Sequence, residues 1–504
     1  MCVSNFEQQI LCPLSDHLIN GGAREAFLIA GTTYSYAQLK DCVMKIRGAV
    51  SQSGSDEKVW ALAVHDDLET YASIIALWME GRAYVPLHPN QPLERNLNII
   101  EQVGTRHLLD SAMDSVYINS ATEIITTSAL QGTECDLREW QSVSDNELGY
   151  ILFTSGSTGV PKGVCISRRN ISAFIDSFWQ TGIELGSTDR CLQAFDLTFD
   201  VSVQSFLVAL IKGACVCTIP YGQVKYLYAA SLMIDEGITF GAMAPSMLTY
   251  LRPYFDELEI PALKACILTA EACPVDLMED WYKCAVNTEI YDFYGPTEAT
   301  IYCTYYKLNR EEENLSANGI ISIGKPLANV TAVILDEKGK ELGVGDKGEL
   351  CVAGDQITPG YWKNDEKNTT SFFEMELNGE KKRFYRTGDL CYWDGSGNII
   401  YLGRIDQQAK IQGYRVELGE IEYHARRYYN NEKRVVALAF QNEKNLTEVA
   451  LFIESEEQNT QELVEYLKDK MPHYMIPSQY LFEPSFPLNN SDKIDRTALK
   501  QRLL

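Results

Sequence analysis

The sequence predicts an α/β protein with a large N-terminal domain and a small α+β C-terminal domain. Three observations support this prediction. Helical and strand-like segments alternate from the N-terminus to about residue 310, short glycine-rich segments with strand periodicity follow, and the pattern changes again from about Ile399. Alternating helices and strands are typical of doubly wound α/β layers. The glycine-rich stretch indicates a small β-barrel or sandwich after those layers.

The first hundred residues contain the elements of one such layer in order. Their hydrophobic periodicity predicts strands at Ala26–Ile29, Thr33–Tyr36 and Val59–Val64 and helices at Tyr36–Gly48, Leu68–Gly81 and Leu93–Val103. Gly31 supplies the turn between the first two strands. The segment AYVPLHPNQP, residues 83–92, contains three prolines. We expect a stiff loop there, because proline fixes its φ angle and donates no hydrogen bond.

The longest apolar region, residues 201–220, is interrupted by Gln204, Lys212 and Gly213. Because a membrane-spanning helix needs about 20 predominantly apolar residues, this region predicts a buried helix ending near Gly213 and then a strand in ACVCTI. The N-terminal MCVSNFEQQILCPLSDH has no basic start followed by an apolar core, so no signal peptide is expected. We therefore expect a cytoplasmic protein that does not insert into a membrane.

The composition excludes several other classes of protein. The net charge is −25, so a nucleic acid would meet a repulsive average field. The 14 cysteines include no CxxC pair, and the six histidines form no HxH or HxxxH pair, so a zinc site is not expected. Scattered unpaired cysteines indicate a reducing compartment.

A domain boundary is expected at Gly403–Gln408. The segment NIIYLGRIDQQAKIQGYRVELGEIE, residues 398–422, predicts one strand before Asp406, another strand after it, and then a helix. We therefore expect a large domain at residues 1–403 and a small domain at residues 404–504.

The stretch GYILFTSGSTGVPKG, residues 149–163, contains a candidate phosphate-binding loop. Its apolar part predicts a buried strand, and the loop from Thr154 to Lys162 offers two glycines, four hydroxyls and one ammonium. Such a loop can wrap oxyanions, because glycine lets the backbone approach closely, successive amides form a nest and lysine adds charge. It lacks the GxxxxGK[ST] pattern of a Walker A loop. Taken alone, it is equally compatible with a flexible surface turn.

Six motifs in order resemble the adenylate-forming superfamily, which comprises acyl-CoA synthetases, luciferases and the adenylation domains of peptide synthetases. The resemblance covers nearly the whole chain. The motifs are YILFTSGSTGVPKG (150–163), FDVS (199–202), YDFYGPTEAT (291–300), YRTGD (385–389), GRIDQQAKIQGYRVELGEIE (403–422) and SDKIDR (491–496). Their order favours the phosphate-binding interpretation of the loop.

The resemblance implies that a carboxylate attacks the α-phosphate of ATP, with Mg²⁺ present, and releases pyrophosphate. Such transfer depends on positioning and charge stabilisation. Glu298 matches the metal-binding glutamate, Tyr294 the residue that stacks on adenine, and Asp389 the acceptor for the ribose hydroxyls. The implied ATP-binding residues are Thr154, Ser155, Gly156, Ser157, Thr158, Lys162, Asp292, Phe293, Tyr294, Gly295, Thr297, Asp389, Arg404 and Lys493. The implied catalytic residues are Lys493, Glu298 and Thr154.

Lys493 is similar to the family's catalytic lysine, which bridges carboxylate and phosphate oxygens in the transition state. The family usually has Asn-Gly-Lys at this place, whereas this chain has Ser-Asp-Lys. In this family the small domain rotates between an adenylation and a thiolation orientation. The resemblance implies that Asp406 is the hinge and that Gly413 lines the tunnel for the carrier's arm in the second orientation.

Asp200 in FDVS distinguishes between subfamilies. Enzymes that activate α-amino acids have an aspartate here that pairs with the substrate ammonium, and a buried carboxylate needs such a partner. The alternative for Asp200 is an aspartate favoured by the dipole at a helix N-terminus. The resemblance implies a substrate pocket formed by Asp200, Val201, Gln204, Ala242, Leu268, Thr269, Ala270, Phe293, Ile301 and Tyr302.

Two aromatic residues, Phe293 and Tyr302, would fill much of that pocket, which favours a small amino acid, although Gln204 leaves a polar side chain possible. The size of the chain and MPHYMIP, residues 471–477, resemble the D-alanine:carrier protein ligases, so D-alanine is favoured. Those ligases usually have a cysteine where this chain has Thr269. The chirality therefore stays open, and the alternatives are an L-amino-acid adenylation enzyme of a nonribosomal peptide pathway or an acyl- or aryl-CoA synthetase.

The resemblance also implies a separate carrier protein with a phosphopantetheine arm as the partner, and we expect the ligase itself to be a monomer. Carrier proteins are usually acidic. We expect the carrier to dock on a basic helix of the small domain that contains Arg426, Arg427, Lys433 and Arg434.

Overall fold

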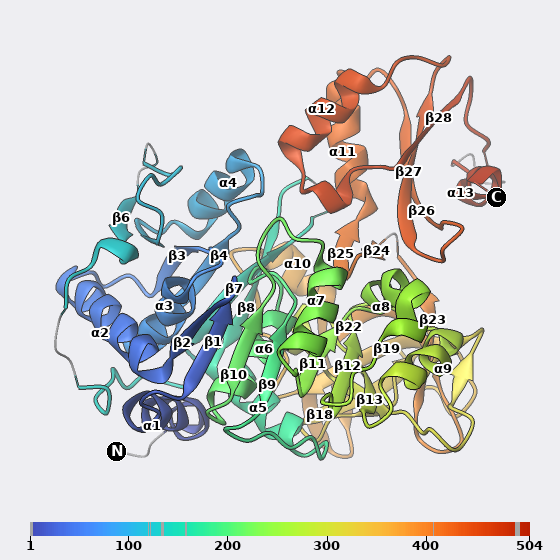
Figure 1. The fold of residues 1–504 in the computed structure, drawn as a ribbon. Coiled ribbons are helices and arrows are strands. Elements are labelled where there is room, and N and C mark those ends of the chain that lie inside the picture. Colours follow the sequence, from blue (N-terminus) through green and yellow to red (C-terminus); the bar gives the residue numbers. More distant parts are fainter. Residues whose placement is uncertain are drawn as a thin grey trace.

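The protein folds as a large domain with a small C-terminal domain packed on one side of it (Figure 1). The computed structural model describes residues 4–118, 120, 122–132, 136–156, 159–406, 408–488 and 494–503. The two ends of the chain lie at opposite ends of the molecule in Figure 1, with the small domain drawn in orange and red. The predicted α/β class with a large and a small domain is confirmed.

The large domain contains two extended sheets. The seven-stranded sheet has the order β20-β8-β7-β4-β3-β5-β6. Its strands are β3 (Val59–Ala63), β4 (Ala83–Leu87), β5 (His107–Asp110), β6 (Glu123–Thr126), β7 (Leu148–Thr154), β8 (Lys162–Ser167) and β20 (Gly360–Tyr361). β3, β4, β5 and β6 pair in parallel, whereas β7 and β8 form an antiparallel hairpin.

The nine-stranded sheet has the order β17-β14-β13-β12-β11-β9-β10-β1-β2. Its strands are β1 (Glu25–Ile29), β2 (Thr32–Ser35), β9 (Arg190–Gln193), β10 (Cys215–Thr218), β11 (Phe240–Met243), β12 (Ala265–Thr269), β13 (Glu289–Tyr294), β14 (Thr304–Lys307) and β17 (Lys325–Pro326). The six strands from β13 to β1 in this order pair with one another in parallel, whereas β14 and β2 pair antiparallel on either side of them. The carboxyl ends of parallel strands meet at one edge, where ligands bind in open α/β sheets.

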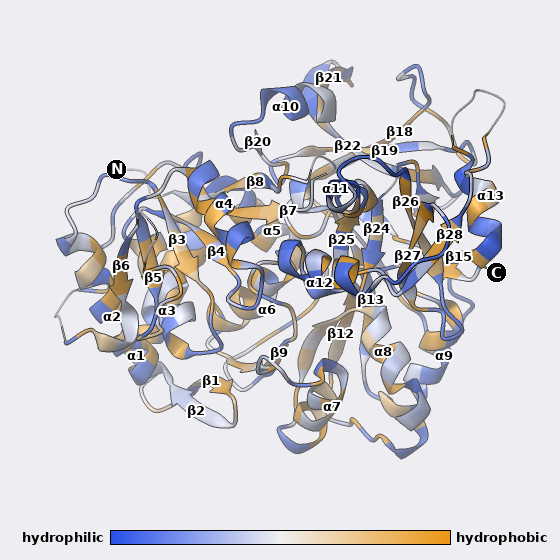
Figure 2. Cartoon of the chain, turned by 90° about the horizontal axis from the view of Figure 1, so that it is seen from above, coloured by the Kyte–Doolittle hydropathy of each residue, from blue (hydrophilic) through white to orange (hydrophobic). Residues whose placement is uncertain are grey.

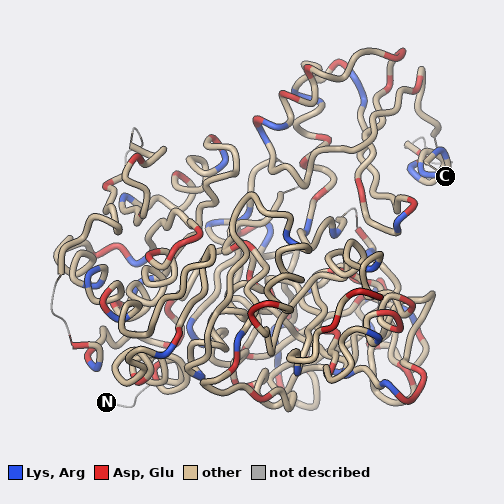
Figure 3. Tube along the Cα trace, viewed as in Figure 1, with Lys and Arg blue, Asp and Glu red and all other residues tan. Residues whose placement is uncertain are grey.

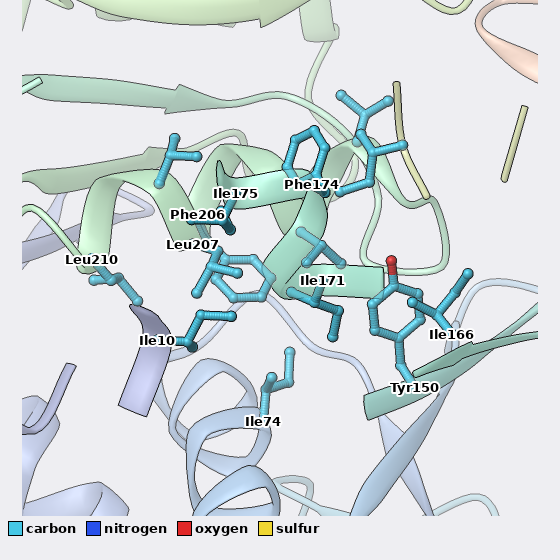
Figure 4. Packing of buried hydrophobic residues seen from close by; sticks show 14 of the residues in the cluster. Ile10, Ile74, Tyr150, Ile166, Ile171, Phe174, Ile175, Phe206, Leu207 and Leu210 are labelled. Carbon is cyan, nitrogen blue, oxygen red and sulfur yellow. The ribbon is translucent and has the colours of Figure 1, made fainter. Parts of the chain in front are cut away.

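Helices cover and separate the two sheets. They are α1 (Cys12–Asn20), α2 (Tyr36–Gln52), α3 (Leu68–Met79), α4 (Leu93–Val103), α5 (Arg168–Trp179), α6 (Val201–Leu210), α7 (Lys225–Asp235), α8 (Pro245–Leu251) and α9 (Val275–Cys284). Every residue of α6 is buried, as expected for a helix that is apolar on all sides. In Figure 4, Phe206 and Leu207 of α6 pack beside Ile74 of α3 and Phe174 of α5. Burial of one such side chain contributes about 1.5–3 kcal/mol.

The predicted small β unit follows the two sheets. It is an antiparallel five-stranded sheet that contains β18 (Val330–Leu335), β19 (Gly348–Gly354), β21 (Phe372–Leu377), β22 (Glu380–Trp393) and β23 (Ile399–Arg404). Helix α10 (Asp365–Ser371) precedes β21. The strand β22 presents Asp389 at its pairing with Arg404 at the end of β23.

The small domain begins with a two-stranded ribbon and continues with a three-stranded sheet flanked by helices. Its elements are β24 (Gln408–Ile411), β25 (Tyr414–Glu417), α11 (Leu418–Tyr428), β26 (Val435–Gln441), β27 (Thr447–Glu454), α12 (Gln461–Lys470), β28 (Gln479–Glu483) and α13 (Arg496–Lys500). It has its own apolar cluster, which includes Ile421, Leu451 and Leu467.

One predicted loop is wrong at its start, because residues 83–87 form the buried strand β4. Pro86 is aligned with Leu62 in the parallel pairing with β3. On its other side, β4 pairs with β7 only at Tyr84, which lies opposite Tyr150. Pro86 has no N–H to donate. Because Pro86 is not paired with β7, no hydrogen bond between these two strands is lost, and the sheet tolerates the proline.

Apolar residues concentrate in the strands and buried helices, whereas blue, hydrophilic segments lie on the outer helices (Figure 2). Acidic residues are distributed over both domains rather than gathered in one segment (Figure 3). In the part of the chain that the structure describes, no helix is long and apolar enough to cross a membrane. The apolar stretch at residues 201–220 is instead the predicted buried helix, α6, followed by β10.

Candidate active site

The candidate phosphate-binding loop connects β7 to β8. Thr154 pairs with Lys162 across this hairpin. A Cβ atom on Gly156 would lie 2.0 Å from the Val160 carbonyl oxygen, so only glycine fits there. The buried Thr154 Oγ1 has no hydrogen-bond partner. Ser157 and Thr158 lie outside the described residues. The Lys162 ammonium is buried and donates to Glu417 Oε1 of the small domain at 2.9 Å.

Glu298 lies in a short 3-10 turn after β13 and is fully buried. Its Oε1 accepts a hydrogen bond from the Tyr361 hydroxyl at 2.6 Å, and its Oε2 accepts one from Arg415 Nη1 at 2.7 Å. Burial alone would raise the pKa of Glu298, but the charges of Arg415 and Lys162 lower it to about 2. Glu298 is therefore an anion beside the loop at every ordinary pH.

Three predicted nucleotide-binding residues, Tyr294, Asp389 and Arg404, lie together. The Tyr294 hydroxyl donates to Asp389 Oδ2, and Arg404 Nη1 donates to Asp389 Oδ1 at 3.0 Å. Gly295 follows Tyr294, and a Cβ there would lie 2.5 Å from the Ile301 carbonyl oxygen. The nine-stranded sheet thus supplies a ring, and the five-stranded sheet supplies a carboxylate and a guanidinium, to one cluster.

Asp292 is buried on the same strand as Tyr294. Burial raises the pKa of Asp292 to about 8, although the nearby Lys410 lowers it. Lys410 Nζ lies 5.3 Å from the centroid of the Tyr294 ring. Burial lowers the pKa of Lys410. The small domain thus places one cation against the predicted adenine-binding face.

Asp200 precedes α6 and is only 4% exposed. Its side chain does not cap the helix, and its Oδ2 has no hydrogen-bond partner. Burial raises the pKa of Asp200 to about 7. A buried carboxylate oxygen without a partner is costly, so this atom is suited to a cationic ligand rather than to helix capping.

Six of the other predicted pocket residues lie on α6 and on three neighbouring strands of the nine-stranded sheet. Val201 and Gln204 lie on α6, Ala242 on β11, Leu268 and Thr269 on β12, and Phe293 on β13. Thr269 is aligned with Phe293 in the parallel pairing of β12 and β13. The Tyr302 hydroxyl donates to Gln204 Oε1 at 3.3 Å, and the Phe293 and Tyr302 ring centroids are 4.9 Å apart. Ala270 and Ile301 have φ angles of 70° and 72°. Both values lie in the left-handed region, so the chain turns at these two predicted pocket residues.

The small domain also contacts this region through Gly413. Its N–H donates to Glu271 Oε1 at 2.7 Å, and its φ angle is 83°. A Cβ on Gly413 would lie within 3.7 Å of Ala244, Ala270 and Phe195. Gly413, Tyr414 and Phe195 help to line a cavity of about 480 Å³ between the two domains.

Two further predicted residues are Asp406, in the connection between the two domains, and Lys493, near the C-terminus. Asp406 accepts two hydrogen bonds from Arg404, Nε to Oδ1 at 2.9 Å and Nη2 to Oδ2 at 2.6 Å. Lys493 lies outside the described residues, so its position is not compared with the site.

The sequence interpretation missed three residues that contact the site. Arg415 pairs with Glu298, Glu417 pairs with Lys162, and Glu420 accepts from the Gly156 N–H at 2.9 Å. A signal for the first two was present: Arg415 and Glu417 are two residues apart in the strand expected after Asp406 and therefore share one face of it.

The expectation of one basic helix is wrong in part. Helix α11 ends at Tyr428, and both Asn430 and Asn431 have positive φ angles. Arg426 and Arg427 therefore lie in the last turn of α11, while Lys433 and Arg434 follow it.

Within the described residues, no three His, Cys, Asp or Glu side chains gather as a preformed metal site. Glu298 supplies one buried carboxylate at this place. This donor set fits Mg²⁺, because that ion is usually held by one or two carboxylates together with waters and substrate phosphates.

Comparison with known proteins identifies the relatives of this chain. A family model described as AMP-binding enzyme matches residues 19–362. The chain is 34% identical to tyrocidine synthase 3 from Brevibacillus parabrevis over 85% of its own length, and it spans only 6% of that protein.

Solved structures share the fold. Holo-PA1221, an NRPS protein containing adenylation and PCP domains bound to a vinylsulfonamide inhibitor, matches with a TM-score of 0.85 at 21% identity, over 99% of this chain and 85% of that one. The Vibrio cholerae adenylation domain AlmE in complex with glycyl-adenosine-5'-phosphate matches with a TM-score of 0.84 at 24% identity, over 98% and 97% of the two chains.

Proposed function

The chain belongs to the AMP-binding enzyme family, and from this premise we propose that it activates an amino acid as an aminoacyl-AMP and then loads it onto a carrier protein. In the first step a carboxylate oxygen of the amino acid bonds to the α-phosphorus of ATP, and pyrophosphate leaves with the bonding electrons. In the second step a phosphopantetheine sulfur bonds to the acyl carbon, AMP leaves, and the thiol proton passes to solvent.

The unpartnered carboxylate oxygen of Asp200 is the observation that carries the amino-acid assignment. It lies among buried residues and lacks any hydrogen-bond donor. The ammonium of an α-amino acid would supply both the charge and the donor. A fatty or aryl acid would leave this oxygen unpaired, which disfavours the alternative of an acyl- or aryl-CoA synthetase.

The cluster around Tyr294 and Asp389 supports binding of the nucleoside part of ATP. Asp389 already accepts from Arg404 and Tyr294, and a carboxylate of this kind can accept from vicinal ribose hydroxyls. The loop with Thr154 and Lys162 would hold the phosphates. Glu298 would hold Mg²⁺, which would offset the charge of those phosphates when bound.

The walls of the pocket favour a small amino acid. Phe293 and Tyr302 are 1% and 0% exposed and lie in contact, so their rings take up the space that a large side chain would need. D-Alanine is our first candidate. The relationship to a tyrocidine synthase favours the second candidate, a small L-amino acid or glycine in a nonribosomal peptide pathway.

The cavity at Gly413 supports the transfer step. It opens between the domains and is lined by residues of both, as required for the arm of a separate carrier to reach the acyl group. We propose that the protein works in the cytoplasm as a monomer. All twelve cysteines within the described residues are free, which agrees with a reducing compartment.

ATP–pyrophosphate exchange across a panel of D- and L-amino acids, glycine and fatty acids tests this proposal. We expect exchange with a small amino acid and none with a fatty acid. Exchange with fatty acids alone would favour the CoA-synthetase alternative, and no exchange with any acid would contradict the proposed function. Exchange confined to D-alanine or to an L-amino acid decides between the two candidates.

A further inference from the structure

One face of helix α6 carries two buried polar atoms without a partner. Asp200 directly precedes the helix and Gln204 follows four residues later, so their side chains lie on the same face, one turn apart. Asp200 is 4% exposed and Gln204 is 0% exposed. Neither Asp200 Oδ2 nor Gln204 Nε2 has a hydrogen-bond partner. The first atom is an acceptor and the second is a donor.

Two tyrosines connect these atoms into one buried polar site. The Tyr302 hydroxyl donates to Gln204 Oε1 at 3.3 Å. Burial, together with the charge of Asp200, raises the pKa of Tyr302 well above its ordinary value. The same two causes raise the pKa of Tyr150, whose buried hydroxyl also lacks a partner. Asp200 therefore lies within electrostatic reach of both hydroxyl groups.

The amide of Gln204 requires an acceptor that the chain does not supply. A buried donor that makes no hydrogen bond is destabilising, and such groups are rare in folded proteins. The proposed ammonium of the amino acid satisfies Asp200 but cannot accept from Gln204 Nε2. Alanine and glycine have no polar side-chain atom, so either of them would leave this donor unpaired. We infer that the substrate carries a side-chain hydroxyl and that Gln204 selects serine over alanine.

The size and charge of the site exclude longer or acidic side chains. The Phe293 and Tyr302 rings are buried with their centroids 4.9 Å apart, so they leave room for a short side chain only. A side-chain carboxylate would add a second negative charge beside Asp200, and like charges in one buried site repel. A hydroxyl both donates and accepts. It can accept from Gln204 Nε2 and donate its own proton to the Tyr150 hydroxyl oxygen.

This inference rests on the proposed function and narrows its substrate. The resemblance of the sequence favours alanine, whereas the unpartnered amide favours serine, and the chirality stays open. A site that hydrogen-bonds a substrate hydroxyl rejects the analogue without it more strongly than an apolar pocket rejects an added hydroxyl. Gln204 would thus determine specificity without contacting the carboxylate that reacts.

ATP–pyrophosphate exchange with serine, 2-aminobutyrate and alanine, each in its D and L form, tests the assignment. 2-Aminobutyrate has a methyl group where serine has its hydroxyl, so this pair separates polarity from size. We expect kcat/KM for serine to exceed that for 2-aminobutyrate of the same handedness about 10- to 100-fold. Alanine should fall below serine as well.

Gln204→Met identifies the group responsible, because methionine has a similar length and no amide. Serine loses its donor in this variant, whereas 2-aminobutyrate loses nothing, so the ratio of their kcat/KM values should fall to about one. General damage to the fold would lower both values and leave the ratio unchanged. As a control, Gln441→Met makes the same substitution at an exposed glutamine of the small domain and should keep the wild-type ratio.

The wild type alone can overturn the inference, even if Gln204→Met does not fold. Equal kcat/KM for serine and 2-aminobutyrate, or a preference for alanine over serine, would contradict a hydroxylated substrate while leaving the proposed function intact. An unchanged ratio in folded Gln204→Met would remove Gln204 from its role. No exchange with any acid would overturn both the inference and the proposed function.

Discussion

Arg415 of the small domain and Glu298 of the large domain form a buried ion pair, with Nη1 and Oε2 2.7 Å apart. The side chain of Glu298 is 0% exposed and that of Arg415 is 15% exposed. The pKa of Glu298, about 2, lies below its ordinary value of 4.5. A lowered folded-state pKa contributes stability that is present above the unfolded pKa and is lost as the pH falls toward 2. The pair therefore holds the domains together throughout the neutral range.

Arg415→Ala should uncouple the two proposed steps. Removing one partner of a buried ion pair costs about 3–5 kcal/mol in the docked state, so the small domain should dock less often. We expect carrier loading to slow at least about tenfold while ATP–pyrophosphate exchange persists. Loading is measured as aminoacyl transfer to holo-carrier protein. As a control, Arg502→Ala removes an exposed small-domain guanidinium and should leave loading unchanged. Equal loading by Arg415→Ala and Arg502→Ala would contradict the role of the Arg415–Glu298 ion pair in docking.

The pKa of Asp200, about 7, should control the pH dependence of amino-acid binding. Only the carboxylate attracts an ammonium, so KM for the amino acid should rise about tenfold per unit as the pH falls below 7. KM should be constant above about pH 8. A KM independent of pH between 5 and 8 would be incompatible with this assignment.

Asp200→Asn separates activity from stability. Because the folded-state pKa of Asp200 is raised, the wild type loses stability as the pH rises from about 4 to about 7. Asparagine carries no such charge, so the variant should lose exchange activity and yet gain roughly 2–4 kcal/mol of unfolding free energy at pH 8. Urea unfolding measures this gain. The exposed Asp276 provides the control, since Asp276→Asn should change neither quantity.

Tyr302→Ala should enlarge the amino-acid pocket. The side chain is fully buried against Phe293, and truncation of a buried aromatic residue costs about 3–5 kcal/mol of stability. We expect the exchange profile to shift from small toward larger amino acids. As a control, Tyr254→Ala truncates an exposed tyrosine and should keep the wild-type exchange profile. An unchanged profile in Tyr302→Ala would contradict the assignment of Tyr302 to the amino-acid pocket.

Gly413→Ala should impair transfer but not adenylation. The φ angle of 83° costs a non-glycine residue about 1–2 kcal/mol, and the added methyl group would point toward Ala244, Ala270 and Phe195. We expect slower carrier loading with normal ATP–pyrophosphate exchange. Gly339→Ala is a close control, because its φ angle is 80° and its Cβ would meet open space. If both variants load the carrier equally well, the cavity at Gly413 does not serve the carrier arm.

Lys493→Ala should slow adenylation by several orders of magnitude, on the order of a thousandfold or more. The reason is that a positioned cation stabilises charge that develops only in the transition state. Nucleotide binding, measured by calorimetry with ATP, should be largely kept. Lys468→Ala removes an exposed lysine of the same domain and should retain activity. Undiminished exchange in Lys493→Ala would contradict its catalytic role.

Much of the fold could be predicted from local sequence. Helix α4 begins and ends at the predicted residues, Leu93 and Val103, because its apolar spacing and the flanking Pro92 and Gly104 define both ends. Strand β4 could not be recognised, since proline ordinarily marks a loop and only the incomplete pairing with β7 makes Pro86 acceptable in the sheet.

The sequence by itself determined the family motifs, the α/β layers and the presence of a carboxylate at position 200. Only the tertiary structure decided that Asp200 has an unpartnered oxygen and that Arg415, Glu417 and Glu420 meet the phosphate-binding loop. The physical reason is the range of the interactions involved. Helix ends and strand periodicity depend on neighbours a few residues apart, whereas the loop and its partners are about 260 residues apart and interact only through the orientation in which the two domains dock.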